Sequence, residues 1–215
     1  MSLKSIIEVL KSHSLLFSIV ISLYLLFIIF GIIIGKRKPK FLVIFLKTRT
    51  EQGQKQIEKI FGKYRDSVRN GKVSTILKCS FIVFGLNTLG LIQNTILSAL
   101  LIPLVLQLGF AAIMQGISFS ETKGSSLFSL LSYYFVGGLE WITYPLANFA
   151  GILFTSSIIT SIINKRNILL LDNFSNVISV LFPCVIILFF QGFLELLYIR
   201  KVLVNGGTAN PLQPY

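Results

Sequence analysis

The chain has 215 residues, of which 53% are hydrophobic and only 13% charged, and its mean hydropathy is +0.79. Soluble domains carry about 25% charged residues, so this composition excludes an ordinary water-soluble domain, and its high hydrophobicity excludes intrinsic disorder. Twenty Lys and Arg against eight Asp and Glu give a net charge of +12, while two cysteines are too few for a disulfide-rich secreted fold. We therefore expect membrane-spanning helices joined by cationic segments.

The first predicted span is the uncharged run 12–35. It exceeds the roughly 20 residues that cross a hydrocarbon layer of about 30 Å. A signal peptide has a shorter apolar core, of about 7 to 15 residues, followed by a small-residue cleavage site. Here the run ends in Gly-Lys-Arg-Lys, which predicts a retained membrane anchor.

Residues 79–115 form a second uncharged tract. As one helix this tract would be about 55 Å long, which exceeds the thickness of a bilayer. Polar residues cluster near its middle, so we expect the chain to fold back there, with spans at about 73–91 and 94–115. A single crossing of this tract is the alternative.

The third apolar tract, 127–163, contains Trp141, Tyr144 and Pro145 near its centre, and we expect two spans that meet at about residue 144. A last span is predicted at about 174–198. The predicted fold is an all-α integral membrane protein, a polytopic bundle of about six transmembrane helices, or five in the alternative. The expected parts are an N-terminal anchor span (1–35), a basic cytoplasmic segment (36–78), a membrane bundle (79–201) and a flexible C-terminal tail (202–215).

Most of the positive charge lies in residues 36–78, which hold 13 basic and 3 acidic side chains. Short loops rich in Lys and Arg remain in the cytoplasm, so we expect this segment inside the cell and the N-terminus outside. Counting six spans from there predicts that Lys165 and Arg166 lie inside, and that Arg200 and Lys201 lie outside.

Within the basic segment, hydrophobic residues recur at the spacing of one helical face, which predicts an amphipathic helix on the inner leaflet; they are Ile57, Ile60, Phe61, Tyr64 and Val68. Basic residues are expected to bind anionic lipid or a cytoplasmic partner, such as the ATPase subunit of an ABC transporter; they are Lys36, Arg37, Lys38, Lys55, Lys59, Lys63 and Arg69. No nucleic-acid recognition motif accompanies this charge, so nucleic acid is not an expected partner.

The sequence offers few groups for catalysis. His13 is the single histidine, and one histidine cannot form the usual zinc site of two or three histidines. Cys79 and Cys184 lie in apolar runs, away from His13 on the predicted topology. We therefore expect no catalytic residue, metal or cofactor, and an enzyme is the less favoured class.

Ionisable side chains within spans are costly, and they indicate function by default. Glu140 and Glu195 are such residues, and with Asn87 they are expected to form a polar intramembrane cluster in the outer half of the bilayer. Three interpretations stay open: the carboxylates reach the headgroups or pair with nearby bases, they hold helices in register or contact a transported peptide, or they act in acid-base catalysis. Small residues at Gly137, Gly138 and Gly151 are expected to let helices approach closely.

The stretches 137–151 (GGLEWITYPLANFAG) and 191–201 (QGFLELLYIRK), together with Asn87, resemble the stage II sporulation protein M family of multi-pass membrane proteins. That family typically has a His-Gly-x-x-Glu motif, a glycine 11 residues after the glutamate, and a further glutamate near the end of its last span. The matching positions here are Gly137, Glu140, Gly151 and Glu195, whereas Val136 occupies the histidine position.

The resemblance covers about residues 80–201. It implies that the chain is a divergent, non-enzymatic member of this family and lies in the cell membrane. Relatives are encoded with circular bacteriocins, which implies an accessory subunit in the maturation, export or immunity of a bacteriocin-like peptide. Two alternatives remain: a scaffold that works with cell-wall hydrolases during sporulation engulfment, and an intramembrane peptide cyclase or protease that uses Glu140 and Glu195.

Overall fold

A computed structural model describes residues 3–37, 39–40, 44, 48, 55, 58–59, 61–100, 109, 112–117, 127–164 and 170–204. The elements in this part of the chain are all helices: α1 (Leu3–Ser12), α2 (Ser14–Arg37), the 3-10 turn η1 (Gly62–Tyr64), α4 (Arg65–Arg69), α5 (Val73–Ala99), α7 (Leu127–Ile163) and α8 (Leu170–Val204). Within these residues the prediction of an all-α fold is confirmed.

Four helices are long and apolar enough to cross a membrane, among the described residues; they are Ser14–Arg37, Val73–Ala99, Trp141–Ile163 within α7, and Phe174–Lys201 within α8. Length and composition thus indicate a membrane protein. The predicted count of six spans is not confirmed. In particular, 127–163 is a single helix rather than two, and α5 continues through the turn predicted near residue 92.

Pro145 explains why the prediction of a break in α7 was wrong. Proline has no N–H, so the carbonyl of Trp141, four residues earlier, loses its donor within the helix. Membrane helices tolerate proline where a neighbouring helix satisfies the freed carbonyl. Here the hydroxyl oxygen of Tyr24 in α2 lies 3.5 Å from the Trp141 carbonyl oxygen, and α7 continues to Ile163.

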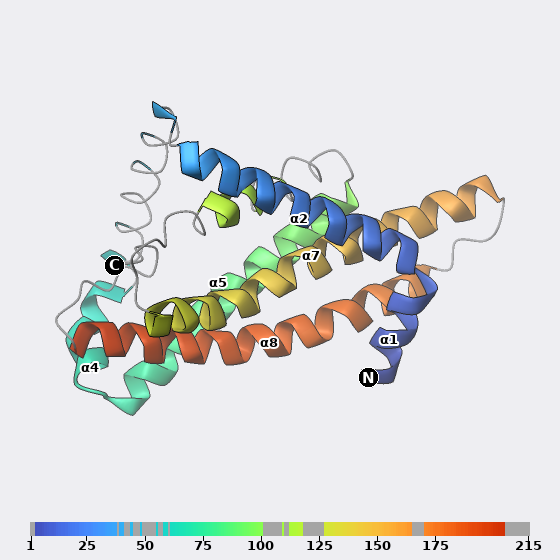
Figure 1. Cartoon of the computed structure of the whole chain (residues 1–215). Helices are drawn as coiled ribbons and strands as arrows, with labels where there is room; N and C mark the ends of the chain where they lie inside the picture. The colour runs from blue at the N-terminus through green and yellow to red at the C-terminus, as the bar shows by residue number, and fades with distance from the viewer. Residues whose placement is uncertain are drawn as a thin grey trace.

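Helices α5, α7 and α8 form the centre of the bundle (Figure 1). Leu91 of α5, Ala147 of α7, and Cys184 and Leu188 of α8 form one buried cluster where the three helices meet. Helix α8 runs antiparallel to the other two, so α5 and α7 are parallel. The residues between Ala99 and Leu127 therefore connect opposite ends of the bundle.

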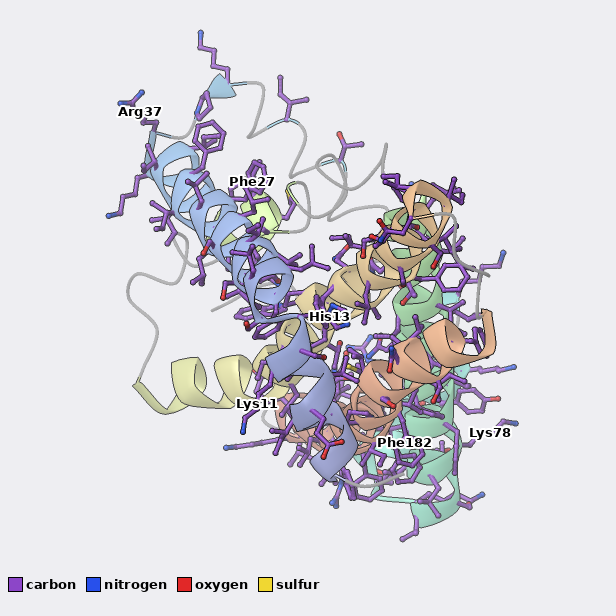
Figure 2. All side chains as sticks on the ribbon, turned by 90° about the vertical axis from the view of Figure 1, so that its right-hand side faces the viewer. Lys11, His13, Phe27, Arg37, Lys78 and Phe182 are labelled. Carbon is purple, nitrogen blue, oxygen red and sulfur yellow. The ribbon has the colours of Figure 1, made fainter. Side chains whose placement is uncertain are left out.

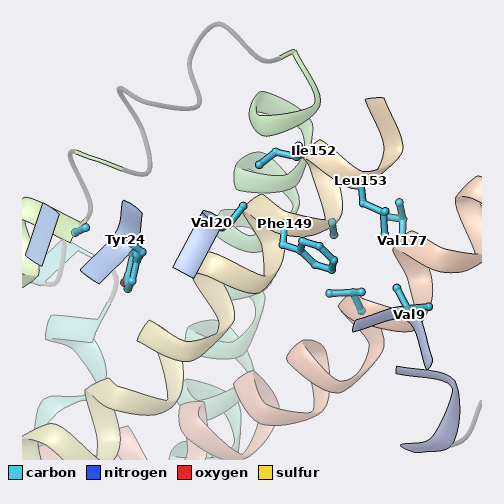
Figure 3. Close-up of a cluster of buried hydrophobic side chains, with 10 residues drawn as sticks. Val9, Val20, Tyr24, Phe149, Ile152, Leu153 and Val177 are labelled. Carbon is cyan, nitrogen blue, oxygen red and sulfur yellow. The ribbon is translucent and has the colours of Figure 1, made fainter. Parts of the chain in front are cut away.

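Helices α1 and α2 cover one side of this centre. Figure 3 shows Val20 of α2 beside Phe149 of α7, while Val9 of α1 and Val177 of α8 belong to the same buried cluster. Residues 112–117 are helical and pack closely on α2. Glycines make this contact possible, since a side chain on Gly31 or Gly116 would collide with the backbone of the opposite segment. Most of the outer face of α2 is exposed hydrophobic surface, as lipid contact requires.

We call the end of the bundle where α2 and α8 finish and where α5 and α7 begin the basic end (Figure 1). Val68 of α4 packs there with Ile76 of α5 and with Leu196 and Leu203 of α8. The C-terminal end of α8, with Arg200 and Lys201, thus lies beside the basic segment. The prediction that these two residues lie across the membrane from it was wrong, because it counted six spans.

The ends of α7 and α8 that flank residues 165–169 lie at the opposite end of the bundle. The predicted position of Lys165 and Arg166 inside the cell depended on the count of six spans, which is not confirmed. Both residues lie outside the described part of the chain, as does the predicted C-terminal tail from residue 205 onward.

Candidate functional site

A chain of polar side chains joins α5 and α8 inside the bundle. The Asn87 amide nitrogen donates to Gln191 Oε1 at 2.6 Å, and Gln191 Nε2 donates to Glu195 Oε2 at 2.8 Å. Gln191 is only 1% exposed. The two hydrogen bonds lead in series from α5 to the carboxyl group of Glu195 on α8.

We call Asn87, Gln191 and Glu195 the polar chain. Two of its members were predicted from the sequence, whereas Gln191 was missed. The signal for Gln191 was its position four residues before Glu195, on the same face of a helix. Nothing in the sequence could pair it with Asn87, which is 104 residues away along the chain.

Glu140, the third predicted member, lies on α7, and its side chain is outside the described residues. Its backbone level follows from the buried cluster at Ala147, Leu91 and Leu188. Glu140 lies seven residues, about 10 Å, from Ala147 on α7, and Glu195 lies seven residues from Leu188 on α8, in both cases toward the basic end. The two glutamates therefore share a level, as predicted from the sequence.

The predicted depth of the two glutamates was wrong relative to the basic segment. Glu195 is six residues, about 9 Å, from Lys201, where the candidate span in α8 reaches the basic end. The sequence reading placed both glutamates near the end opposite the basic segment, because it assumed a chain turn near residue 144. Without this turn, the polar chain extends from the middle of the bundle toward the basic end.

A second set of polar contacts ties α5 to α7 nearer the other end. Ser98 Oγ donates to Asn148 Oδ1, the Asn148 amide donates to the Tyr144 carbonyl at 2.8 Å, and Thr155 Oγ1 donates to the Ala99 carbonyl at 2.5 Å. Ser98 and Asn148 are essentially fully buried. In a membrane, such hydrogen bonds between helices stabilise their association and fix their relative register.

A third polar contact joins α2 to the helical residues 112–117. The Tyr24 hydroxyl donates to Gln115 Oε1, and both side chains are buried. Because Tyr24 also reaches the Trp141 carbonyl, it links α2 to two other parts of the bundle. Sequence reasoning did not single out Tyr24 or Gln115.

The predicted packing glycines differ in their surroundings. A side chain at Gly151 would meet α5, with its Cβ 2.8 Å from the Ala99 nitrogen and closer still to the Thr95 carbonyl oxygen. A Cβ at Gly138 would have no atom of another residue within 4 Å, and the surroundings of Gly137 are outside the described residues. Gly192, which the sequence did not suggest, lies on α8 against Ser80 and Phe84 of α5.

The basic segment folds onto the bundle rather than away from it. Phe61 and Tyr64 are partly buried against the cluster that contains Val68, while Ile57 and Ile60 lie outside the described residues. In the described part, the apolar face predicted to lie on the inner leaflet therefore packs on α5 and α8. Among the described residues of this stretch, 55, 58–59 and 61 are helical, and η1 and α4 follow them.

The basic residues predicted to bind lipid or a partner occupy two places. Lys36 and Arg37 are exposed at the end of α2, and Lys63 and Arg69 are exposed on η1 and α4. Lys55 and Lys59 are also exposed, whereas Lys38 is outside the described residues. Figure 2 shows Arg37 and Lys78 on opposite sides of the bundle, so the bases at the end of α2 are separate from those around α4.

Lysine side chains surround Tyr64. The ammonium nitrogens of Lys63 and Lys78 lie 5.0 and 5.3 Å from the centroid of the Tyr64 ring, a cation–π distance. Hydrogen bonding with Lys78, and to a smaller extent with Lys63, lowers the pKa of the Tyr64 hydroxyl below its ordinary value and outweighs the opposite effect of burial. This shift indicates a concentration of positive charge where η1 meets α5.

Candidate catalytic groups are not assembled among the described residues. No group of three His, Cys, Asp or Glu side chains there could hold a metal ion. His13 lies between α1 and α2, at the end of the bundle opposite the basic end (Figure 2). Cys79 packs at the basic end, and Cys184 lies in the buried cluster with Leu91 and Leu188. No nucleophile–histidine pair is therefore formed by these residues.

Comparison with known proteins gives no relative from which function could be carried over. The chain matches no protein-family model, no curated protein and no solved structure.

Proposed function

We propose that this chain is a non-enzymatic, multi-pass protein of the cell membrane that acts as an accessory subunit of a membrane assembly. Its task would be the maturation, export or immunity of a bacteriocin-like peptide. The partners would be other membrane proteins, such as an ABC transporter ATPase, and the peptide itself. The basic end would face the cytoplasm, since Lys and Arg of short loops remain on that side.

The observation that carries this proposal is the polar chain within an otherwise apolar bundle. Polar side chains inside a membrane are costly and are kept where they hold helices together or contact a substrate. Here Asn87 and Gln191 both donate hydrogen bonds in the direction of Glu195. The reactive partner that acid-base catalysis would need, a nucleophile or a metal site, is not formed by the described residues.

Two further features support a subunit role. Exposed hydrophobic residues lie on α2, α5 and α8, and this surface is available to lipid or to other membrane helices. In addition, the resemblance to the stage II sporulation protein M family, through Gly137, Glu140, Gly151 and Glu195, suggests a protein that works with partners.

Affinity purification from mild detergent tests the assembly. The tagged chain, expressed in its own host, should retain an ATPase subunit or the peptide, identified by mass spectrometry. Retention of a cell-wall hydrolase alone would instead favour the sporulation scaffold.

Glu195→Gln and Glu140→Gln separate an accessory subunit from an enzyme. An accessory subunit should lose assembly, or tolerate the change and keep its product. If both variants keep the complex intact but form no mature peptide, the chain is an enzyme and the proposal is wrong.

A further inference from the structure

A cationic surface is built at the basic end by α4 and the start of α5, which are neighbours in the sequence, together with the end of α8. Helix α4 is held there by Val68, which is 4% exposed and packs on Ile76 of α5 and Leu196 of α8. The basic side chains of η1 and α4 are therefore fixed against the ends of two spans rather than carried on a loose loop.

The charge balance of this surface is strongly positive. Residues 61–80 and 196–204 contain one acidic residue, Asp66, and seven exposed basic residues, namely Lys63, Arg65, Arg69, Lys72, Lys78, Arg200 and Lys201. Like charges gathered at one place repel one another, and a bound anion relieves this repulsion.

Arg200 and Gly71 show that the surface has a defined geometry. Gly71 has a φ of +73°, a conformation that favours glycine, and it makes the turn between α4 and α5. The Arg200 guanidinium lies over this turn, because a Cβ at Gly71 would be 2.6 Å from Arg200 Nη2. The ammonium groups of Lys63 and Lys78 both lie beside the ring of Tyr64, where η1 meets α5.

The depth of this cationic surface in the membrane indicates which kind of anion it binds. The candidate span in α5 begins at Val73, and that in α8 ends at Lys201. Lys78 and Arg200 therefore lie within a few residues of the hydrocarbon boundary, where lipid phosphates are found, and their long side chains can extend to this level.

Exposed hydrophobic residues continue the surface toward the membrane centre. Phe193, Leu197 and Arg200 follow one another on α8 at intervals of four and three residues, and all are exposed. One stripe of the helix thus carries apolar side chains below a guanidinium. This pattern suits the acyl chains and the phosphate of a single phospholipid.

We infer that the junction of α4, α5 and α8 binds the phosphate group of an anionic phospholipid, with Arg200 and Lys78 as its principal ligands and Lys63 and Arg69 beside them. This site would hold the basic segment at the membrane surface. The inference rests on the membrane placement in the proposed function, but it does not depend on the peptide or the partner subunit.

Native mass spectrometry of the detergent-purified full chain tests the site. The protein is titrated with phosphatidylglycerol, with phosphatidylcholine, and with phosphatidylglycerol in the presence of soluble glycerophosphate. We expect preferential binding of phosphatidylglycerol that millimolar glycerophosphate does not displace. Equal binding of the two lipids would overturn the inference, and displacement by glycerophosphate would assign the site to a free phosphate instead.

A matched pair of double variants separates a built site from general charge. Each basic residue near an anionic surface contributes up to roughly fivefold in affinity, so Lys78→Gln with Arg200→Gln should weaken phosphatidylglycerol binding by up to about 25-fold. Lys4→Gln with Lys11→Gln removes the same charge from α1, at the other end of the bundle, and should change binding less than twofold. Equal loss in the two double variants would show that only net charge matters.

Two further variants guard against misfolding. Lys78→Arg with Arg200→Lys keeps both charges and should keep most of the binding. If the Gln double variant does not remain monodisperse, Lys78→Gln alone should cost about fivefold. Unchanged binding in this single variant would remove Lys78 from the site, and an acidic protein retained in place of lipid would assign the surface to a partner.

Discussion

Replacing Gln191 by leucine should destabilise the bundle, because Gln191 is the centre of the polar chain. Leucine has a similar volume, but it removes the acceptor of Asn87 and the donor to Glu195. Hydrogen bonds within membrane proteins contribute about 0.6 kcal/mol on average and about 1.7 kcal/mol at most. Loss of the two bonds should therefore lower the free energy of unfolding by about 1 to 3 kcal/mol.

Equilibrium unfolding in mixed micelles of dodecyl maltoside and SDS measures this change. Trp141 is the single tryptophan of the chain and reports on α7 through its fluorescence. A double-mutant cycle of Gln191→Leu with Asn87→Leu isolates the bond between the two helices. We expect a coupling energy of about 0.6 to 1.7 kcal/mol.

Gln93→Leu is the matched control for this cycle. Gln93 is exposed on the same helix as Asn87, and its replacement should change stability by no more than about 0.5 kcal/mol. If Gln191→Leu is no more destabilising than Gln93→Leu, and the coupling energy is below about 0.3 kcal/mol, the polar chain does not stabilise the association of α5 and α8. The energetic reasoning above would then be refuted.

Two other predictions concern packing and topology. Gly151→Val should lower the thermal stability of the detergent-purified protein by several degrees, since its Cβ would collide with the backbone of α5. The control Gly138→Ala meets no described atom within 4 Å and should be neutral or stabilising by up to about 1 kcal/mol. Equal effects of the two substitutions would argue against the packing of α5 on α7. Single cysteines at Asn164 and Lys201, in a chain without its native cysteines, should react with a membrane-impermeant maleimide from opposite sides of the membrane, because α8 crosses it once. Labelling of both from the same side would contradict this path of α8.

The sequence predicted the class of fold from the chemistry of single segments. Long uncharged runs bury enough apolar surface in lipid to be membrane helices whatever surrounds them. The predicted first span, 12–35, nearly coincides with α2 (Ser14–Arg37), and the predicted last span lies within α8. The concentration of positive charge in residues 36–78 was equally visible, because counting charges needs no contacts.

Breaks within apolar tracts could not be predicted, because they depend on partners. Asn87, Asn94 and Pro145 indicated chain turns, yet in the folded chain each lies within a continuous helix. Asn87 is satisfied by Gln191 and Asn94 by the carbonyl of Gly90 in its own helix, while the Tyr24 hydroxyl lies 3.5 Å from the carbonyl freed by Pro145. A polar group that finds a partner does not need to leave the membrane.

The sequence by itself therefore determined that this is a helical membrane protein with a segment rich in basic residues. Only the tertiary structure decided that α5 and α7 are parallel, that Arg200 joins the basic end, and that Gln191 connects Asn87 to Glu195. The physical reason is that hydrophobicity acts on each segment separately, whereas hydrogen bonds and close packing between helices need two surfaces that the chain brings together only on folding.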